Sequence, residues 1–238
     1  MFREFINLLF MQFKMIKAYL PVFIFFSILF PLGFIFSFGT IIQRTLSTYL
    51  ISGSITFFIS INSIISVAQN LALERSSGRF SLMIASGIPI QLYAISITIS
   101  NGIQTLMLIP VFLVLGYFLL GVKISSALFF VLSIIGSIYM ASMVGLLIGT
   151  AIRNLHAVNQ WSSIIGFILS FFAPVYFPLT QIPLPFRYLA YLEPTTYVSQ
   201  STYFALVGDP ISLAWFGGTV VIGFLFSFLS SLLMKKAF

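Results

Sequence analysis

The chain alternates long apolar stretches with short polar segments. A helix needs about 20 predominantly apolar residues to cross the hydrocarbon core of a bilayer. Six stretches reach this length, at approximately residues 19–39, 47–70, 88–120, 125–151, 158–177 and 211–234. The pattern therefore predicts an all-α integral membrane protein with six transmembrane helices. Pro31 and Pro110 lie within the first and third stretches, where they predict kinks.

Residues 1–17 predict an amphipathic helix that lies at the membrane surface. On a helix, the polar residues Arg3, Asn7, Lys14 and Lys17 gather on one arc and apolar residues fill the other. An N-terminal extension of the first transmembrane helix is the alternative. No soluble domain interrupts the apolar stretches, so residues 1–238 are expected to form a single membrane domain.

Composition supports the membrane assignment and excludes several functions. Hydrophobic residues make up 60 % of the chain and charged residues 6 %, against about 25 % charged residues in soluble domains. Cysteine is absent, which excludes disulfides, thiolate catalysis and cysteine-ligated metals. The net charge of +7 comes from basic residues at the rims of apolar stretches, so nucleic-acid binding is not expected.

Lysine and arginine fall unequally on the two sides of the predicted membrane. One side has eight of them: Arg3, Lys14, Lys17, Arg75, Arg79, Arg153, Lys235 and Lys236. The other side has three: Arg44, Lys123 and Arg187. Because cytoplasmic loops are enriched in Lys and Arg, both termini are predicted to lie in the cytoplasm of a multi-pass plasma-membrane protein.

Few residues are suited to catalysis. The only histidine, His156, and the acid Asp209 fall on opposite sides of a core about 30 Å thick. Glu4, Glu74 and His156 share a side but match no metal-ligand spacing. A P-loop of the form Gly-x-x-x-x-Gly-Lys-Ser/Thr is also absent. We therefore expect no catalytic residue, metal or cofactor in this chain, and any ATP must bind to another subunit.

The segment at residues 71–87 combines charge with apolar side chains. Glu74, Arg75 and Arg79 are followed by Phe80 and further apolar residues, and Gly87 then offers a stop for a short helix. Such a helix is suited to docking in the groove of a partner protein. A solvated loop whose arginines only set the membrane orientation is the alternative, and the residues alone do not choose between the two.

The segment from Pro174 to Tyr197 holds five of the ten prolines, two charges and several aromatic residues. Proline lacks the backbone N–H donor and clashes with the preceding helical turn, so this segment cannot form one continuous helix. It is nevertheless too apolar for a solvated loop. A broken, partly membrane-embedded (re-entrant) element over residues 174–203 is predicted, since irregular backbone is tolerated at membrane depth when protein shields it.

Within the predicted helices, polar and small residues recur at helical spacing. Polar positions include Asn62, Ser66 and Asn70 in the second stretch and Ser163 and Ser170 in the fifth. Interhelical hydrogen bonding and a substrate pathway both remain open for them. No span centre carries a charge, which argues against an ion-coupled transporter. A small-residue stripe in the fourth stretch predicts close helix packing, either within one subunit or in a dimer: Ser133, Ser137, Ala141, Gly145 and Gly149.

Two segments resemble the ABC-2 type permeases, the membrane subunits of ATP-driven exporters. Glu74-Arg-Ser-Ser-Gly-Arg-Phe80 is similar to the coupling-helix region of that family. Tyr176-Phe-Pro, Ile182-Pro and Glu193-Pro-Thr-Thr-Tyr197 are similar to its outer segment. The chain departs from the family at Ala173-Pro174, where glycine is frequent, and at Gln200–Tyr203, where an arginine is frequent.

The resemblance implies a subunit that pairs with a second, identical or similar permease subunit in the lipid membrane. ABC ATPase subunits, which bind ATP and Mg, would attach below, and an apolar or amphipathic compound would move outward. The resemblance assigns ATPase coupling to Glu74, Arg75, Arg79 and Phe80. Pathway positions would be Asn62, Ser66, Asn70, Ser163, Phe167, Ser170 and Phe171. The extracellular gate would comprise Tyr176, Phe177, Pro178, Pro183, Glu193, Pro194 and Tyr197. A secondary transporter or channel acting alone, and a membrane scaffold, are the rival functions.

Overall fold

The computed structural model describes residues 6–7, 29, 33, 35–37 and 46–237. The predicted interfacial helix (1–17) and first span (19–39) therefore lie largely outside the described residues, and so does Pro31. From residue 46 onward every regular element is a helix. The helices are α2 (Ser47–Ser76), α3 (Arg79–Ala85), α4 (Ile90–Leu120), α5 (Ala127–Ala151), α6 (Leu155–Phe172), η2 (Leu179–Gln181), α7 (Leu184–Leu192), α8 (Pro194–Val207) and α9 (Ser212–Ala237).

Five of these helices are long and apolar enough to cross a membrane: α2, α4 from Leu92, α5, α6 and α9 to Met234. They correspond to the second to sixth predicted stretches, so the all-α membrane class is confirmed. The count of six is not tested, because the first stretch is largely undescribed. Of that stretch, residues 29, 33 and 35–37 are helical, and Ile35 is buried in a core cluster with Ile55 and Phe112.

Two helix ends differ from the predicted boundaries by five residues or more. α2 continues to Ser76, six residues past the predicted end, because the apolar residues after position 70 extend the helix. α6 ends at Phe172 instead of residue 177. Ala173 adopts an extended conformation (φ −68°, ψ 140°), since the ring of the following proline disfavours a helical conformation at the preceding residue.

α5 packs closely on α2 through the predicted small-residue stripe. A Cβ at Gly145 would lie 2.5 Å from the carbonyl oxygen of Ile64, and one at Gly149 would lie 3.1 Å from that of Ala68. Both residues of the glycine pair therefore contact α2 of the same chain. For this pair, the structure answers the question that the sequence left open: the contact lies within one subunit.

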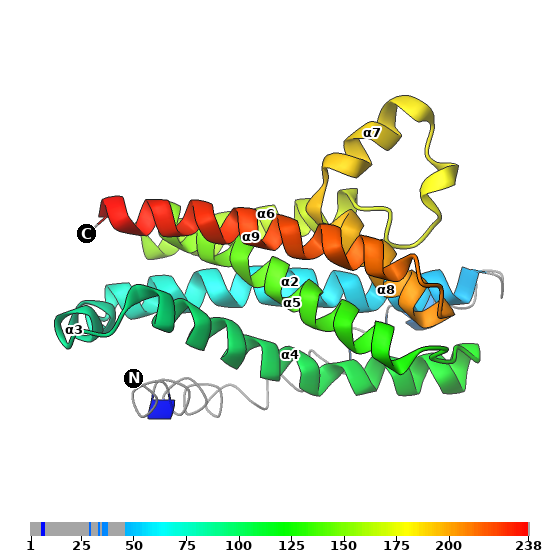
Figure 1. Cartoon of the computed structure of the whole chain (residues 1–238), viewed down its shortest axis with the longest axis horizontal. Helices are drawn as coiled ribbons and strands as arrows, with labels where there is room; N and C mark the ends of the chain where they lie inside the picture. Colours follow the sequence, from blue (N-terminus) through cyan, green and yellow to red (C-terminus); the bar gives the residue numbers. More distant parts are fainter. Residues whose placement is uncertain (1–5, 8–28, 30–32, 34, 38–45, 238) are drawn as a thin grey trace.

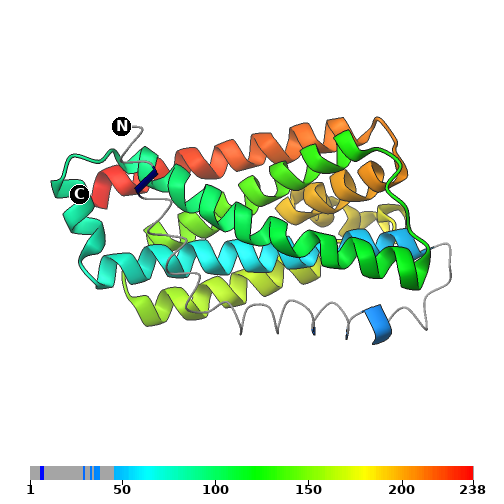
Figure 2. The same ribbon diagram turned by 90° about the horizontal axis from the view of Figure 1, so that it is seen from below.

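The bundle has two distinct ends. Figure 1 shows α3 at one end, where α9 also finishes, and α7 and α8 at the opposite end. α4 bends near its middle in the same view, and Pro110 lies inside this helix. Seen from below, α6 runs alongside α2 (Figure 2). Linkers 77–89 and 152–154 thus share the α3 end, and residues 121–126 and 173–211 share the other.

Candidate functional site

The predicted coupling loop contains a short helix, as expected. α2 ends at Ser76, Gly78 adopts a left-handed conformation (φ 74°), and α3 follows over Arg79–Ala85. Gly87 (φ 80°) and the extended Pro89 separate α3 from α4. Glycine suits the two left-handed positions because it has no Cβ to clash with the backbone. α3 is thereby fixed between the ends of two long helices.

Glu74 and Phe80 both face the protein interior and meet Tyr93 of α4. The Glu74 side chain is fully buried (0 % exposed) and its carboxylate accepts a hydrogen bond from the Tyr93 hydroxyl. The Phe80 ring packs edge-on against the Tyr93 ring, with 5.2 Å between centroids. A buried carboxylate needs such a donor, because removing a charge from water is costly. Tyr93 therefore ties the end of α2 and the start of α3 to α4.

Arg75 ties the same region to α5. Its Nη2 donates to the carbonyl oxygen of Ile152, the residue that ends α5, at 3.0 Å. Arg79 donates from Nε to the Ser77 hydroxyl at 3.0 Å. All four predicted coupling residues thus have contacts within their own chain, and none was predicted from the sequence to pair with Tyr93 or Ile152.

The outward surface of α3 is formed by other residues: Ser81, Leu82, Ala85 and Ser86. Leu82 is the most prominent, with 72 % of its surface exposed. Sequence reasoning missed it, although a signal was present. Residues two apart project from roughly opposite sides of a helix, so burial of Phe80 turns Leu82 outward.

Two of the predicted pathway residues on α2 form hydrogen bonds to α4. Asn62 Nδ2 donates to Thr105 Oγ1 at 3.1 Å, and the Ser66 hydroxyl donates to Asn101 Oδ1. Asn101 is buried and continues the network by donating from Nδ2 to the Ser142 hydroxyl of α5 at 3.2 Å. Asn62 and Ser66 thus join three helices, while Asn70 on the same helix is half-buried.

The predicted pathway residues on α6 surround an aromatic contact with α2. Phe57 of α2 is buried and meets the edge of Phe171 at 5.2 Å and of Phe167 at 6.4 Å between centroids. The Phe167 and Phe171 rings stack on each other at 6.1 Å. Ser170 is fully buried, and the half-buried Ser163 donates back to the carbonyl oxygen of Asn159 at 2.9 Å.

Phe167 and Phe171 belong to a continuous exposed stripe along α6, called here the α6 stripe. Its members recur at spacings of three and four residues, which places them on one helix face. They are Trp161, Ile164, Phe167, Ile168, Phe171 and Phe172. Only 22 % of the residues of α6 are buried within the chain, against 72 % in the most apolar 18-residue stretches of α2 and α5. The stripe thus leaves an apolar face for lipid or another protein.

The root of the predicted outer segment is packed tightly on α2. A Cβ at Gly53 would overlap the carbonyl oxygen of Val175 and lie 2.6 Å from the Tyr176 ring. The Ser199 hydroxyl of α8 donates to the carbonyl oxygen of Pro174 at 3.2 Å. Phe177 is partly exposed and Pro178 precedes η2. The segment is broken into η2, α7 and α8, as its prolines predict; its depth in a membrane is untested.

Glu193 joins α7 to α8 and caps α8. Its carboxylate accepts from the backbone N–H groups of Thr195 (3.0 Å) and Thr196 (2.7 Å) and from both hydroxyls, with Pro194 in the first turn. Burial raises the pKa of the Glu193 carboxyl, and these hydrogen bonds oppose that shift. The Thr195 hydroxyl also lies 2.5 Å from the carbonyl oxygen of Leu169, which brings this cap against α6.

α7 is attached to the bundle by few contacts. It follows Pro183 and projects away from the other helices (Figure 1). Arg187 closes the turn before it by donating to the carbonyl oxygens of Thr180 (2.7 Å) and Ile182 (2.9 Å). The Tyr191 ring stacks on Trp215 of α9 at 6.4 Å, and Tyr197 of α8 meets the same indole edge-on at 5.5 Å.

Comparison with known protein families identifies the family of this chain. The model of the ABC-2 type transporter family matches residues 3–207 of the 238. The match spans the α2–α3 region, the α6 stripe and the broken segment through α8. No curated protein matches the chain significantly in sequence. The family match confirms the resemblance inferred from the two sequence segments, and the chain belongs to the ABC-2 type transporter family.

Proposed function

We propose that this permease subunit forms, with a second copy or a paralogue, the pathway of an ABC exporter. The pathway moves an apolar or amphipathic compound outward, such as a drug, a lipid or a lipid-linked glycan. ATP hydrolysis on separate ABC ATPase subunits drives the movement, and ATP and Mg bind there. The single observation that carries the proposal is the anchored helix α3, which is held from the inside and offers Leu82 to the outside.

The contacts of α3 support a coupling role. A partner that binds the face around Leu82 and shifts α3 also shifts α4, because Phe80 and Glu74 both hold Tyr93. It shifts the α5–α6 turn as well, because Arg75 holds Ile152. Glu74, Phe80 and Arg75 then act by transmitting movement within the chain. The partner itself contacts Leu82 and the neighbouring small polar residues.

The α6 stripe supports the proposed pathway and substrate class. Its exposed rings, with Phe57 behind them, offer an apolar surface free of charge. We assign Phe167 and Phe171 to the pathway, together with the neighbouring Ser163 and Ser170. Asn62 and Ser66 contribute by holding α2 against α4 and α5 while α6 moves.

The distribution of charge supports the proposed orientation. Among the described residues, Arg75, Arg79, Arg153, Lys235 and Lys236 belong to the α3 end of the bundle. Lys123 and Arg187 belong to the other end. Since positive charge favours the cytoplasmic side, the α3 end faces the cytoplasm and the ATPases. The broken segment then faces outward, where Tyr176, Phe177, Glu193 and Tyr197 act as a gate.

Co-purification from host membranes tests the coupling site. A tagged wild-type chain is expected to retain an ATPase with a Walker motif in stoichiometric amounts, whereas Leu82→Asp is expected to lose at least nine-tenths of it. The reason is that a carboxylate buried in an apolar groove without a partner is strongly unfavourable. Ile211→Asp is the matched control, because Ile211 is an exposed aliphatic residue at the opposite end of the bundle.

Two results contradict the proposal. One is wild-type protein that carries no ATPase yet transports when reconstituted alone, which is the behaviour of a secondary transporter or channel. The other is equal ATPase recovery with Leu82→Asp and Ile211→Asp, which removes α3 as the docking element.

A further inference from the structure

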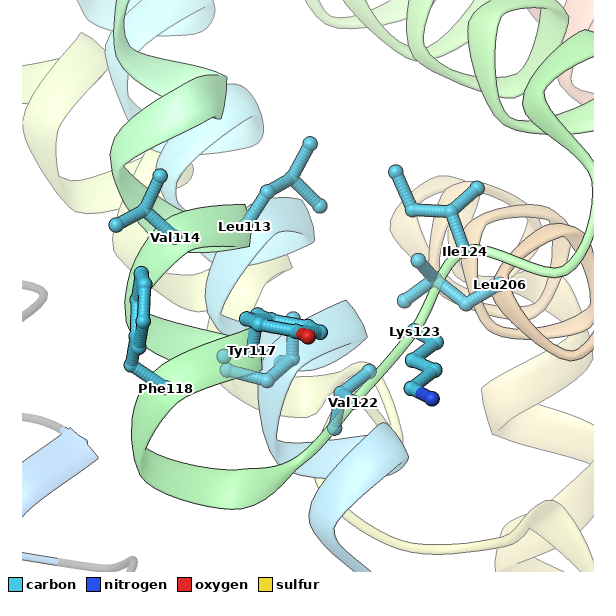
Figure 3. Close-up of a pocket in the computed structure, with 10 residues that line it drawn as sticks. Leu113, Val114, Tyr117, Phe118, Val122, Lys123, Ile124 and Leu206 are labelled. Carbon is cyan, nitrogen blue, oxygen red and sulfur yellow. The ribbon is translucent and has the colours of Figure 1, made fainter.

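A cavity of about 360 Å³ opens at the end of the bundle opposite to α3. Its buried floor is formed by Ile51 of α2 and Leu206 of α8. Figure 3 shows Leu113 and Tyr117 of α4 on one side, with Leu206 and the α4–α5 linker on the other. This volume lies in the range of about 300–1,000 Å³ that is usual for ligand pockets.

Among the described residues that line it, the cavity is apolar apart from two side-chain groups. These are the ammonium group of Lys123 and the hydroxyl of Tyr117. Lys123 is exposed and has no hydrogen bond or ion pair with another residue in the described part of the chain. An apolar cavity with one unpaired cation at its mouth matches a molecule with an apolar tail and a negative head.

The position of the cavity indicates where such a molecule would come from. The spanning part of α4 ends at Leu120 and that of α5 begins at Ala127, so residues 121–126 join two helices that are apolar enough to cross a membrane. Tyrosine and lysine are typical anchors at the ends of such helices, and an ammonium group forms charge-assisted hydrogen bonds with a phosphate. A molecule that enters here from the side comes from the bilayer.

We propose that this cavity binds one acyl chain of an anionic phospholipid whose phosphate pairs with Lys123. The lipid site is separate from the proposed pathway, because its lining comes from α2, α4, α8 and the α4–α5 linker and none of it from α6. The linker is itself joined to α8, since the Ser125 N–H donates to the carbonyl oxygen of Leu206 at 3.0 Å. A bound lipid therefore stabilises the junction of α4, α5 and α8.

Lipid titration of the purified full chain in neutral detergent tests the site. Bound phosphatidylglycerol and phosphatidylcholine with the same acyl chains are counted by native mass spectrometry. Wild type is expected to favour phosphatidylglycerol, and Lys123→Gln to bind it about fivefold more weakly with phosphatidylcholine unchanged. A fivefold change in affinity corresponds to about 1 kcal/mol, the upper end of the range for an exposed ion pair. Arg153→Gln is the matched control, because it removes one exposed cation at the other end.

The cavity is tested separately from the charge. Val122→Trp places an indole in the apolar space from the linker and is expected to abolish the preference for phosphatidylglycerol while Lys123 remains. Ile124→Trp serves the same purpose if Val122→Trp does not fold. Soluble glycerol phosphate, which has the charge without the chain, is expected not to compete.

Three outcomes overturn the proposal: equal binding of the two lipids by wild type, unchanged binding by Lys123→Gln, or effective competition by glycerol phosphate. None of them depends on an ATPase or on transport, so failure of this site and failure of the proposed function are distinguishable.

Discussion

The short helices α3 and α7 lie at opposite ends of the bundle and are attached in opposite ways. α3 has seven residues, yet it is tied to α4 through Phe80, and the preceding residues Glu74 and Arg75 hold α4 and α5. α7 has nine residues, of which six are large exposed hydrophobic side chains, and only Ala190 is buried. α3 is therefore anchored in the bundle by buried side chains, whereas α7 is largely exposed on its surface.

The strength of its attachment determines what each helix is suited to do. A helix with buried anchors moves only together with the long helices that hold it, which is what transmission of a force requires. A helix with few buried contacts opens at little cost in free energy, and mobile lids are drawn from such regions. The proposed coupling helix α3 and the exposed helix α7, which lies between the proposed gate residues Phe177 and Glu193, therefore differ in the stiffness of their attachment, although both are short and apolar.

The largest effect is expected at the root of the outer segment. Gly53→Ala places a Cβ against the carbonyl oxygen of Val175, which is backbone and cannot rotate away. Overpacking of this kind costs about 3 kcal/mol of unfolding free energy, to be measured by thermal unfolding in detergent. Gly217→Ala is the control, because nothing lies within 4 Å of its Cβ position. Equal thermal unfolding midpoints for the two variants would show that the Val175 backbone does not pack against α2 at Gly53.

The second effect concerns the anchor of α3. Tyr93→Phe removes one hydrogen bond to the buried Glu74 carboxylate and is expected to cost about 2 kcal/mol, within the usual range for a hydrogen bond to a charged group. Tyr188→Phe makes the same change on α7, where the side chain is 67 % exposed, and is expected to leave stability unchanged. Thermal unfolding of both variants measures the contrast. If the Tyr93→Phe protein were as stable as the Tyr188→Phe protein, α3 would not be anchored more firmly than α7.

Much of this fold could be predicted from the sequence, because a membrane imposes a simple length rule. Apolar runs of about 20 residues located α2, α4, α5, α6 and α9, and prolines located the broken segment between α6 and α8. The end of α6 was misjudged because apolar composition continues past Phe172, whereas Pro174 sets the boundary.

The site was harder to predict, because contacts between its residues depend on how each helix is oriented about its own axis. Glu74 reads as a surface charge in the sequence, whereas in the structure it is buried and accepts a hydrogen bond from Tyr93, nineteen positions later. Asn62 and Ser66 read as pathway residues, yet their partners Thr105 and Asn101 lie on α4. Composition carries no information on which face of one helix meets which face of another.

A small effect is expected from loosening the turn before α7. Arg187→Gln removes the hydrogen bonds to Thr180 and Ile182 that close the turn before α7, at a cost of about 1 kcal/mol or less since the bonds are partly exposed. Global stability is expected to stay nearly constant, while backbone amides of residues 179–192 exchange with deuterium several-fold faster than in wild type. Arg79→Gln, which removes the bond to Ser77, is expected to leave the exchange of α3 unchanged, because Phe80 still anchors it. If α3 instead loosened as much as α7, its buried contacts would not be what holds it, and the two helices would be attached alike.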